Sequence, residues 1–261
     1  MPPAPSRSRH GITGPLLERR EIPAHRLEAL LKDLGPSLRR GTALSKSLGK
    51  GLRQSDSNLK PCGLACIDTL LEGGFPTGQL AEITGPLSSG RTSVALSLLA
   101  QTTGGSAELA AWVDLADAFD PLSARTLGAD LDRILWIRAH QLSEALRSLE
   151  KLIDTDGIPL VFFDSSGAKG TIPDSVWTRL SRVSRATETT LILLSERRLT
   201  CAQAEIVLEM QEARPFFQGT PPLLEKMALR AVIKRKRGSP IPEIKVTDTL
   251  LPPIPKRTHP G

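Results

Sequence analysis

The chain has 261 residues, 39% of them hydrophobic and 24% charged, and a net charge of +6. This length fits one substantial domain with extensions and is sufficient to bury a core. No apolar run is long enough to span a bilayer and the amino terminus lacks the apolar segment of a signal peptide, so we expect a cytoplasmic protein without membrane contact. Cys62, Cys66 and Cys201 form no disulfide framework, and the four histidines lack metal-ligand spacing.

The charge is distributed unevenly along the chain. Residues 1–60 carry a net charge of +7, residues 61–224 a net charge of −7 and residues 225–261 a net charge of +6. Basic ends around an acidic core indicate an acidic partner, either a nucleic-acid backbone or a protein, or else solvated extensions that keep the chain in solution. The few aromatic residues are not interleaved with the basic stretches, so the sequence gives little support for base stacking.

The amino-terminal part is predicted to be an extension of the main domain. Residues 1–22 are rich in Pro, Ser, Gly and Arg, a composition typical of disorder. In residues 23–34 leucines recur at helical spacing, at Leu27, Leu30, Leu31 and Leu34, and Gly35-Pro36 ends this helix. The predicted organisation is a disordered basic segment (1–22), a helical arm and linker (23–60), a core domain (61–247) and a Pro-rich tail (248–261).

From residue 61, short apolar strands alternate with amphipathic helices, which is typical of βαβ units with a mostly parallel sheet. The expected strands are 80–84, 109–114, 134–137, 160–164 and 190–194, and the expected helices are 67–71, 92–101, 121–127, 141–153 and 174–185. Residues 205–210 and 227–236 are predicted to be antiparallel strands joined by a Pro-containing loop, with a last strand near 243–246. The predicted fold class is therefore α/β with antiparallel carboxyl-terminal strands.

A nine-residue stretch, Gly-Pro-Leu-Ser-Ser-Gly-Arg-Thr-Ser at positions 85–93, joins a predicted strand to a predicted helix. This spacing is that of a phosphate-binding P-loop, in which backbone N–H groups and the helix N-terminus cradle phosphate. Arg91 stands where a P-loop carries lysine, and its broad planar guanidinium is not equivalent to a slim ammonium. The stretch is thus a nucleotide site, a damaged one or a structural corner. The candidate nucleotide-binding residues are Gly85, Ser88, Ser89, Gly90, Arg91, Thr92 and Ser93.

The apolar strand 160–164 ends in Asp164. A parallel sheet would place this carboxylate beside the P-loop, where it could hold Mg²⁺ together with the Thr92 hydroxyl. The pattern therefore predicts ATP or ADP with Mg²⁺ as the cofactor, on condition that nucleotide binds. The alternative is a strand-end aspartate that caps a turn.

Over residues 62–246 the chain resembles the core of the RecA recombinases. The resemblance is carried by residues 70–78, the P-loop, residues 120–130, Phe163-Asp164-Ser165 and residues 232–236. It implies a RecA-like P-loop core with a small amino-terminal helical arm.

The same resemblance implies losses in the ATP site. The glutamate that activates water in the RecA family aligns with Ala116, and the adenine-stacking tyrosine aligns with Ser123. Asp120, which would face adenine, is kept, whereas the glutamine that senses the γ-phosphate aligns with Glu196. A site without base, P-loop lysine and sensor lacks most of the machinery of hydrolysis, because phosphoryl transfer depends on positioning and charge stabilisation. The two DNA-binding loops of the family are also shortened here.

Lys234 and Lys236 match the lysines that reach a neighbouring subunit's ATP in a RecA filament, which implies docking on a RecA subunit. The alternative is two ordinary basic positions on an exposed strand. The leucine face of residues 23–34 resembles the arm with which RecA packs on its neighbour, so this face is a second candidate contact.

Taken together, the shortened core, the altered P-loop and the basic ends resemble the ImuA family of accessory proteins. That resemblance implies a nucleoid-associated role in SOS-induced translesion synthesis, with RecA, the polymerase-like protein ImuB and an error-prone replicative-type polymerase as partners. Two other readings remain: a weak DNA-stimulated ATPase, and a regulator of recombination that binds DNA non-specifically through its basic ends.

Overall fold

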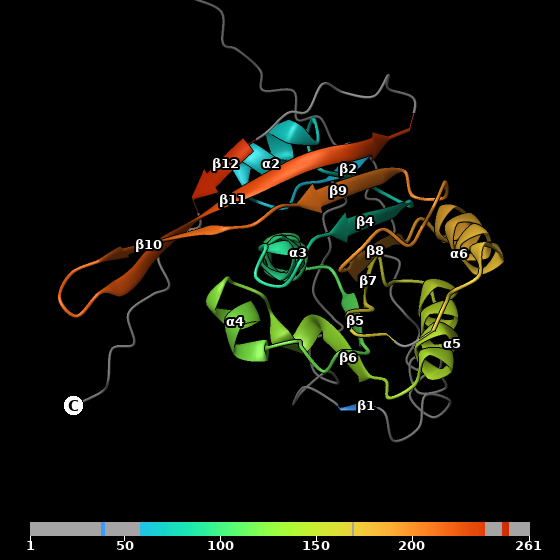
Figure 1. The fold of residues 1–261 in the computed structure, drawn as a ribbon. Helices are drawn as coiled ribbons and strands as arrows, with labels where there is room; N and C mark the ends of the chain where they lie inside the picture. The colour runs from blue at the N-terminus through green and yellow to red at the C-terminus, as the bar shows by residue number, and fades with distance from the viewer. Residues whose placement is uncertain (1–37, 40–57, 169, 238–246, 251–261) are drawn as a thin grey trace, which may run out of the picture.

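A computed structural model describes residues 38–39, 58–168, 170–237 and 247–250 of the chain. Its centre is a sheet with the strand order β1-β6-β5-β7-β8-β4-β9-β11-β10, in which β12 also pairs with β11 (Figure 1). The strands are β1 (Leu38–Arg39), β4 (Leu80–Thr84), β5 (Ala110–Asp114), β6 (Ile134–Arg138), β7 (Leu160–Asp164), β8 (Thr190–Ser195), β9 (Ile206–Met210), β10 (Arg214–Gln218), β11 (Leu223–Lys236) and β12 (Thr247–Leu250). A separate pair consists of β2 (Leu59–Lys60) and β3 (Phe75–Pro76).

Strands β6, β5, β7, β8, β4 and β9 are mutually parallel. Their carboxyl ends therefore lie at one edge of the sheet, which we call the carboxyl edge. Strand β1 is antiparallel to β6, and β11 is antiparallel to β9, β10 and β12. The predicted α/β class with a mostly parallel sheet and antiparallel carboxyl-terminal strands is confirmed.

Helices cover both faces of the sheet (Figure 1). They are α2 (Ala65–Leu70), α3 (Arg91–Ala100), α4 (Pro121–Thr126), α5 (Leu142–Ile153) and α6 (Asp174–Thr187), with a π-helical turn η2 (Gln101–Gly105) and a 3-10 turn η3 (Leu131–Arg133). One buried cluster joins α2, α3 and α4 to one face of the sheet, and a second joins α5 and α6 to the other. Because both faces are covered, strands such as β7 and β8 are buried along their whole length, which explains their continuous apolar sequences.

The largest difference from the sequence-based expectation concerns the loop after β9. Residues 214–218 form β10, which pairs with the first part of β11 in a long hairpin. Pro215 obscured this strand, because proline is tolerated in a sheet only at an edge or a bulge, and β10 is an edge strand.

Smaller differences lie at the ends of the chain. The last strand of the described part of the chain is β12, residues 247–250, and the strand predicted near 243–246 lies outside the described residues. The stretch expected to be a linker has a strand at each end, β1 paired with β6 and β2 paired with β3. The predicted helix at 23–34, including its four leucines, and the tail beyond residue 250 are also outside the described residues. Within the described part of the chain, no helix is both long and apolar enough to cross a membrane.

Candidate functional site

The P-loop runs from the end of β4 to the start of α3, at the carboxyl edge. Gly85 has φ 152°, and a Cβ there would lie 2.4 Å from the carbonyl oxygen of Met210. Gly90, which caps α3, has φ 88°, and a Cβ there would lie 2.4 Å from Cδ2 of Leu229. Glycine is required at both positions because the loop lies against the end of β9 and the side of β11. The backbone thus keeps the form of a phosphate cradle.

Ser89 lies inside this cradle. Its side chain is fully buried, and its Oγ has no hydrogen-bond partner in the described part of the chain. Buried hydroxyls are normally hydrogen-bonded, so this one marks a position where a bound anion or water would add a missing bond. Together with the N-terminus of α3, which favours negative charge, the cradle retains groups that suit a phosphate oxygen.

Arg91 is directed into the protein. Its side chain is 5% exposed, Nη1 donates to the carbonyl oxygen of Gly85 at 2.6 Å, and Nη2 donates to Oγ of Ser166 at 2.8 Å. The guanidinium therefore connects the first residue of the P-loop with the segment after β7. Its donors are used for protein contacts on both sides.

Asp164 completes this group at the end of β7, where it is 2% exposed. Its Oδ1 accepts hydrogen bonds from the backbone N–H of Ser166 at 3.0 Å and from Oγ of Ser166 at 2.5 Å. Burial raises the pKa of Asp164 above the ordinary aspartate value and the neighbouring charge of Asp114 adds to this, whereas the bonds from Ser166 and the charge of Arg91 oppose it. We refer to Gly85, Arg91, Asp164 and Ser166 as the Arg91 network.

A magnesium–nucleotide complex, the group that a P-loop implies, fits only part of this site. The backbone cradle and Ser89 fit phosphate oxygens. The side chains do not fit: Arg91 is bound to Gly85 and Ser166 instead of pointing out of the loop, and Oδ1 of Asp164 is bound twice by Ser166. Asp164 acts here as a turn-capping aspartate, the alternative considered from the sequence. We therefore derive no chemical step through a bound nucleotide.

The remaining predicted site residues also have local roles. Asp120 caps α4, accepting from the N–H groups of Leu122 and Ser123 at 3.1 Å each, and the hydrogen bond from the Ser123 hydroxyl is the main cause that lowers its pKa. Glu196 is exposed directly after β8, at the carboxyl edge beside the start of the P-loop. Asp117, the residue after Ala116, forms a two-pronged ion pair with Arg138. Its carboxylate is therefore held by Arg138 and does not replace the water-activating glutamate that is missing at Ala116.

Lys234 and Lys236 lie near the end of β11 and are both paired with carboxylates of this chain. Lys234 Nζ lies 3.1 Å from Oε1 of Glu209, and Lys236 Nζ bonds to Oε2 of Glu72. Side-chain exposures are 44% and 37% for Lys234 and Glu209, and 20% and 66% for Lys236 and Glu72. Lys234 is therefore exposed, and Lys236 is partly buried beside an exposed carboxylate.

Two buried carboxylates were not singled out from the sequence. Glu82, within β4, is fully buried and accepts from the N–H groups of Leu199 at 2.6 Å and Thr200 at 3.2 Å, and from the hydroxyls of Ser195 and Thr200. A charged residue in the middle of an apolar strand was the available signal. Glu82 fixes the short loop after β8, the position of the second DNA-binding loop in the resemblance.

Asp114 is the second buried carboxylate. It accepts from the N–H groups of Ala118 at 3.1 Å and Phe119 at 3.0 Å, and from Nε1 of Trp136 at 3.2 Å. It is paired in register with Asp164 on the neighbouring strand. The end of the sheet beside the P-loop therefore carries two buried carboxylates, each occupied by protein donors.

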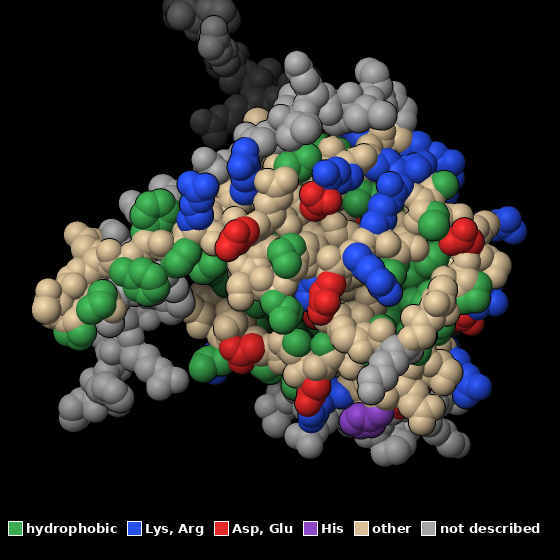
Figure 2. Space-filling model, in the orientation of Figure 1, with side chains coloured by type: hydrophobic (Ala, Val, Ile, Leu, Met, Phe, Trp, Pro, Cys, Tyr) green, Lys and Arg blue, Asp and Glu red, His purple; other side chains and the backbone are tan. Residues whose placement is uncertain are grey.

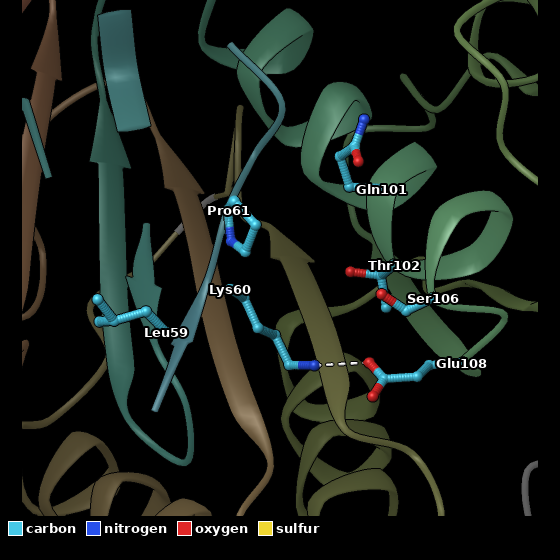
Figure 3. Close-up of a pocket in the computed structure, with 7 residues that line it drawn as sticks. All are labelled: Leu59, Lys60, Pro61, Gln101, Thr102, Ser106 and Glu108. Atoms are coloured by element: carbon cyan, nitrogen blue, oxygen red, sulfur yellow. Dashed lines mark hydrogen bonds and ion pairs between the residues drawn. The ribbon is translucent and has the colours of Figure 1, made fainter. Parts of the chain in front are cut away.

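A small pocket of about 50 Å³ opens at the other end of α3 (Figure 3). It is lined by Leu59, Lys60, Pro61, Gln101, Thr102, Ser106 and Glu108. Lys60 and Glu108 point toward each other across it and form an ion pair of 2.6 Å (Figure 3). Since α3 separates this pocket from the P-loop, it is not an extension of the nucleotide cradle.

Comparison with known proteins assigns the chain to a family. Residues 26–200 match the family model of the RecA N-terminal domain. The chain belongs to this family. It is 39% identical over 124 residues to Protein RecA of Leptospira biflexa serovar Patoc, a match that covers 46% of this chain and 31% of that protein. It is 36% identical over 153 residues to Protein RecA of Lactococcus lactis subsp. cremoris, covering 58% of this chain and 37% of that protein.

The chain thus matches about a third of the length of these RecA proteins. A solved structure, that of the RadB recombinase, superposes with a TM-score of 0.55 at 20% identity, covering 72% of this chain and 94% of that one. This likeness shows the fold alone. The RecA-like core expected from the sequence is confirmed, and the Arg91 network is a property of this chain within it.

Proposed function

We propose that this protein is a non-catalytic RecA-like accessory protein that acts by docking on a RecA-family subunit. The observation that carries the proposal is the Arg91 network. In it, the two side chains that would serve a nucleotide, Arg91 and Asp164, are buried and bonded within the protein.

Hydrolysis lacks further groups. Ala116 offers no carboxylate to activate water, and the neighbouring Asp117 is held by Arg138. Because phosphoryl transfer needs positioned charge and an oriented nucleophile together, the absence of several such groups supports a scaffold role over an ATPase role.

Lys234 and Lys236 provide the proposed contact. Exposed ion pairs contribute only about 0–1 kcal/mol, so exchanging Glu209 and Glu72 for the phosphates of a neighbouring subunit's nucleotide costs little. The end of β11, which would contribute these cations to a partner, is thus available for binding, whereas the P-loop of the same chain is bonded within the protein.

The wider setting follows the resemblance to the ImuA family. We propose that the chain acts in SOS-induced translesion synthesis, at the nucleoid in the cytoplasm, beside ImuB and an error-prone polymerase. Of these partners, RecA is the one that the family match supports, because the chain itself belongs to the RecA N-terminal domain family.

The test is a binding titration of the purified chain against purified RecA, with and without a non-hydrolysable ATP analogue. We expect the Lys234→Ala/Lys236→Ala variant to bind RecA about tenfold more weakly with the analogue and unchanged without it. The matched control is Arg147→Ala/Arg182→Ala, which removes two exposed cations from α5 and α6. Equal losses in both variants, or no loss in either, would refute the contact.

A phosphate-release assay on the same preparation tests the enzymatic alternative. DNA-stimulated release that disappears in Asp164→Ala would replace the accessory role with that of a weak ATPase. We expect no release above background from either protein.

A further inference from the structure

Arginine side chains from α6 and from the end of β11 meet at the amino edge of the sheet, which is the edge opposite the P-loop. Nη2 of Arg185 lies 3.4 Å from Oε2 of Glu205, and Nη1 of Arg237 lies 3.9 Å from the same oxygen. Glu205 comes directly before β9, whose first residues lie at this edge because β9 is parallel to β4. Two guanidinium groups from distant parts of the chain therefore share one carboxylate.

Two further arginines extend this pair. Arg182 lies one turn before Arg185 on α6 and is exposed. Arg235 lies two residues before Arg237 on β11, so its side chain is on the same face of the strand. Neither Arg182 nor Arg235 forms an ion pair with another described residue, and Nε of Arg235 is buried without a hydrogen-bond acceptor in that part of the chain. We call Arg182, Arg185, Arg235 and Arg237 the amino-edge arginines.

The net charge of this surface stays positive when its carboxylates are counted. The amino-edge arginines contribute four positive charges, and Glu205 and Glu188, the exposed residue directly after α6, contribute two negative charges, which leaves +2. Asp154 and Asp156 precede β7, which is three strands away from β9 in the sheet, or about 14 Å. In Figure 2, Lys and Arg side chains accordingly gather at the top right, between the end of β11 and α6. The surface is thus a local concentration of positive charge on a core whose residues 61–224 sum to −7.

This surface is separate from the contacts considered above. Lys236 bonds to Glu72, which follows α2, and α2 packs on the face of the sheet opposite to α6. The amino-edge arginines lie on the α6 side. The loops after β7 and β8, which the resemblance to RecA associates with DNA, begin at the carboxyl edge. The amino-edge arginines therefore belong neither to the lysine contact nor to those loops.

We propose that the amino-edge arginines bind the phosphate backbone of double-stranded DNA. All four cations of this surface are arginines, whose planar guanidinium can donate to two phosphate oxygens at once. Glu205 is shared between two of them at distances of 3.4 and 3.9 Å, so it leaves donors of both available. The proposal does not rest on the accessory function, because other residues and another ligand are involved.

The side chains that this surface lacks decide between the candidate ligands. The exposed large hydrophobic residues of the described ranges all lie on other segments: Leu87, Leu122, Leu127, Phe216 and Phe217. An interface with an acidic protein would be expected to bury aromatic or aliphatic anchors, which are missing here. Single-stranded DNA is usually held by bases that stack on aromatic side chains, and these are missing too. A duplex needs only its backbone to be contacted.

The experiment measures the fluorescence anisotropy of a labelled DNA duplex of about 20 base pairs and mixed sequence, titrated with the full chain. We expect Arg182→Glu/Arg185→Glu to weaken binding at least tenfold and to lower the slope of log Kd against log salt by about one for each lost phosphate contact. The matched control is Arg125→Glu/Arg214→Glu, which makes the same change of charge at two exposed arginines in α4 and β10. It should change binding by less than about twofold.

A change at Glu205 should have the opposite sign. Glu205→Gln keeps the size of the side chain but removes the charge that holds Arg185 and Arg237, so duplex binding should tighten about threefold. The same change at Glu212, an exposed carboxylate between β9 and β10, should leave binding unaltered.

Four outcomes would overturn the proposal. Equal losses in the double variant and its control would assign DNA binding to the overall charge or to the basic ends of the chain. Arg182 has no ion-pair partner among the described residues, so Arg182→Glu alone tests the proposal should the double variant misfold, and duplex binding that neither this change nor Glu205→Gln alters would refute it. A polyglutamate peptide of equal charge that binds as tightly as the duplex would indicate an acidic protein instead. An oligothymidylate that binds more tightly than the duplex would indicate single-stranded DNA.

Discussion

Two regions of this molecule place basic side chains where phosphate contacts are expected, and they differ in burial. In the Arg91 network, the guanidinium and the Asp164 carboxylate are buried and joined through Ser166. At the end of β11, Lys234 and Lys236 are paired with Glu209 and Glu72 at the surface. Both regions satisfy their charges within the chain, but the free energy needed to release them is different.

A buried charge that loses its partner costs several kcal/mol, whereas a surface pair contributes little and is screened by salt. The Arg91 network is therefore part of the folded structure, and the lysine pairs are contacts that a partner can replace. This difference supports a structural role for the P-loop and a partner-binding role for the end of β11. The predictions below test it, beginning with the largest effect.

Replacing Arg91 tests whether the network is structural. We expect Arg91→Met to lower the free energy of unfolding by about 3 kcal/mol, because the carbonyl of Gly85 loses its donor and Asp164 loses a nearby cation. Urea denaturation measures this change. Arg182→Met, which removes an exposed arginine from α6, should change it by less than about 0.5 kcal/mol. A similar small effect at Arg91 would remove the distinction between the two regions.

A more conservative change, to lysine, tests whether Arg91 keeps nucleotide out of the P-loop. Lysine cannot span both Gly85 and Ser166 as a planar fork does, so Arg91→Lys should free the P-loop for nucleotide. We expect binding of a fluorescent ATP analogue to tighten about tenfold, which is about 1.4 kcal/mol. Hydrolysis should stay absent because Ala116 is unchanged. Tight analogue binding by the unaltered chain would show instead that Arg91 does not block the loop.

The raised pKa of Asp164 gives a pH dependence with a defined sign. In the native state this carboxyl stays protonated at pH values above its ordinary pKa of 3.8. The stabilisation that this bound proton gives to the native state is lost as the pH rises through the native pKa. Asparagine has no such proton, so Asp164→Asn should gain stability relative to the wild type as the pH increases from about 3.8. Each pH unit between the two pKa values is worth about 1.4 kcal/mol.

Denaturation curves of both proteins across this pH range measure the difference. It should rise and then level off once the pH exceeds the native pKa. A constant difference would mean that Asp164 titrates normally and that its burial does not affect the charged form.

Much of the fold was predictable because the strands buried on both faces have continuous apolar sequences. Strands β4 and β7 begin and end at the predicted residues. Strand β10 was missed because Arg-Pro-Phe-Phe-Gln contains a proline and lies at the edge, where pairing on one side suffices.

The candidate site was predictable in its positions but not in its contacts. The spacing of glycines located the P-loop, yet the sequence does not say whether Arg91 points toward a ligand or toward Gly85 and Ser166. That choice depends on residue 166, which is 75 positions away in the sequence and adjacent in space. Glu82 was missed for the same reason, since its partners at 199 and 200 come from a distant loop.

The lysine pairs on β11 should have the smallest effect on stability. Lys234→Ala and Lys236→Ala remove exposed ion pairs, so each should lower the free energy of unfolding by less than about 0.5 kcal/mol. Raising the salt concentration should reduce even this difference, because screening weakens exposed pairs far more than buried ones. Urea denaturation at low and high salt measures both effects. A loss above about 2 kcal/mol for either lysine would place it in the structural class with Arg91, and it would then be a poor candidate for contacting a partner.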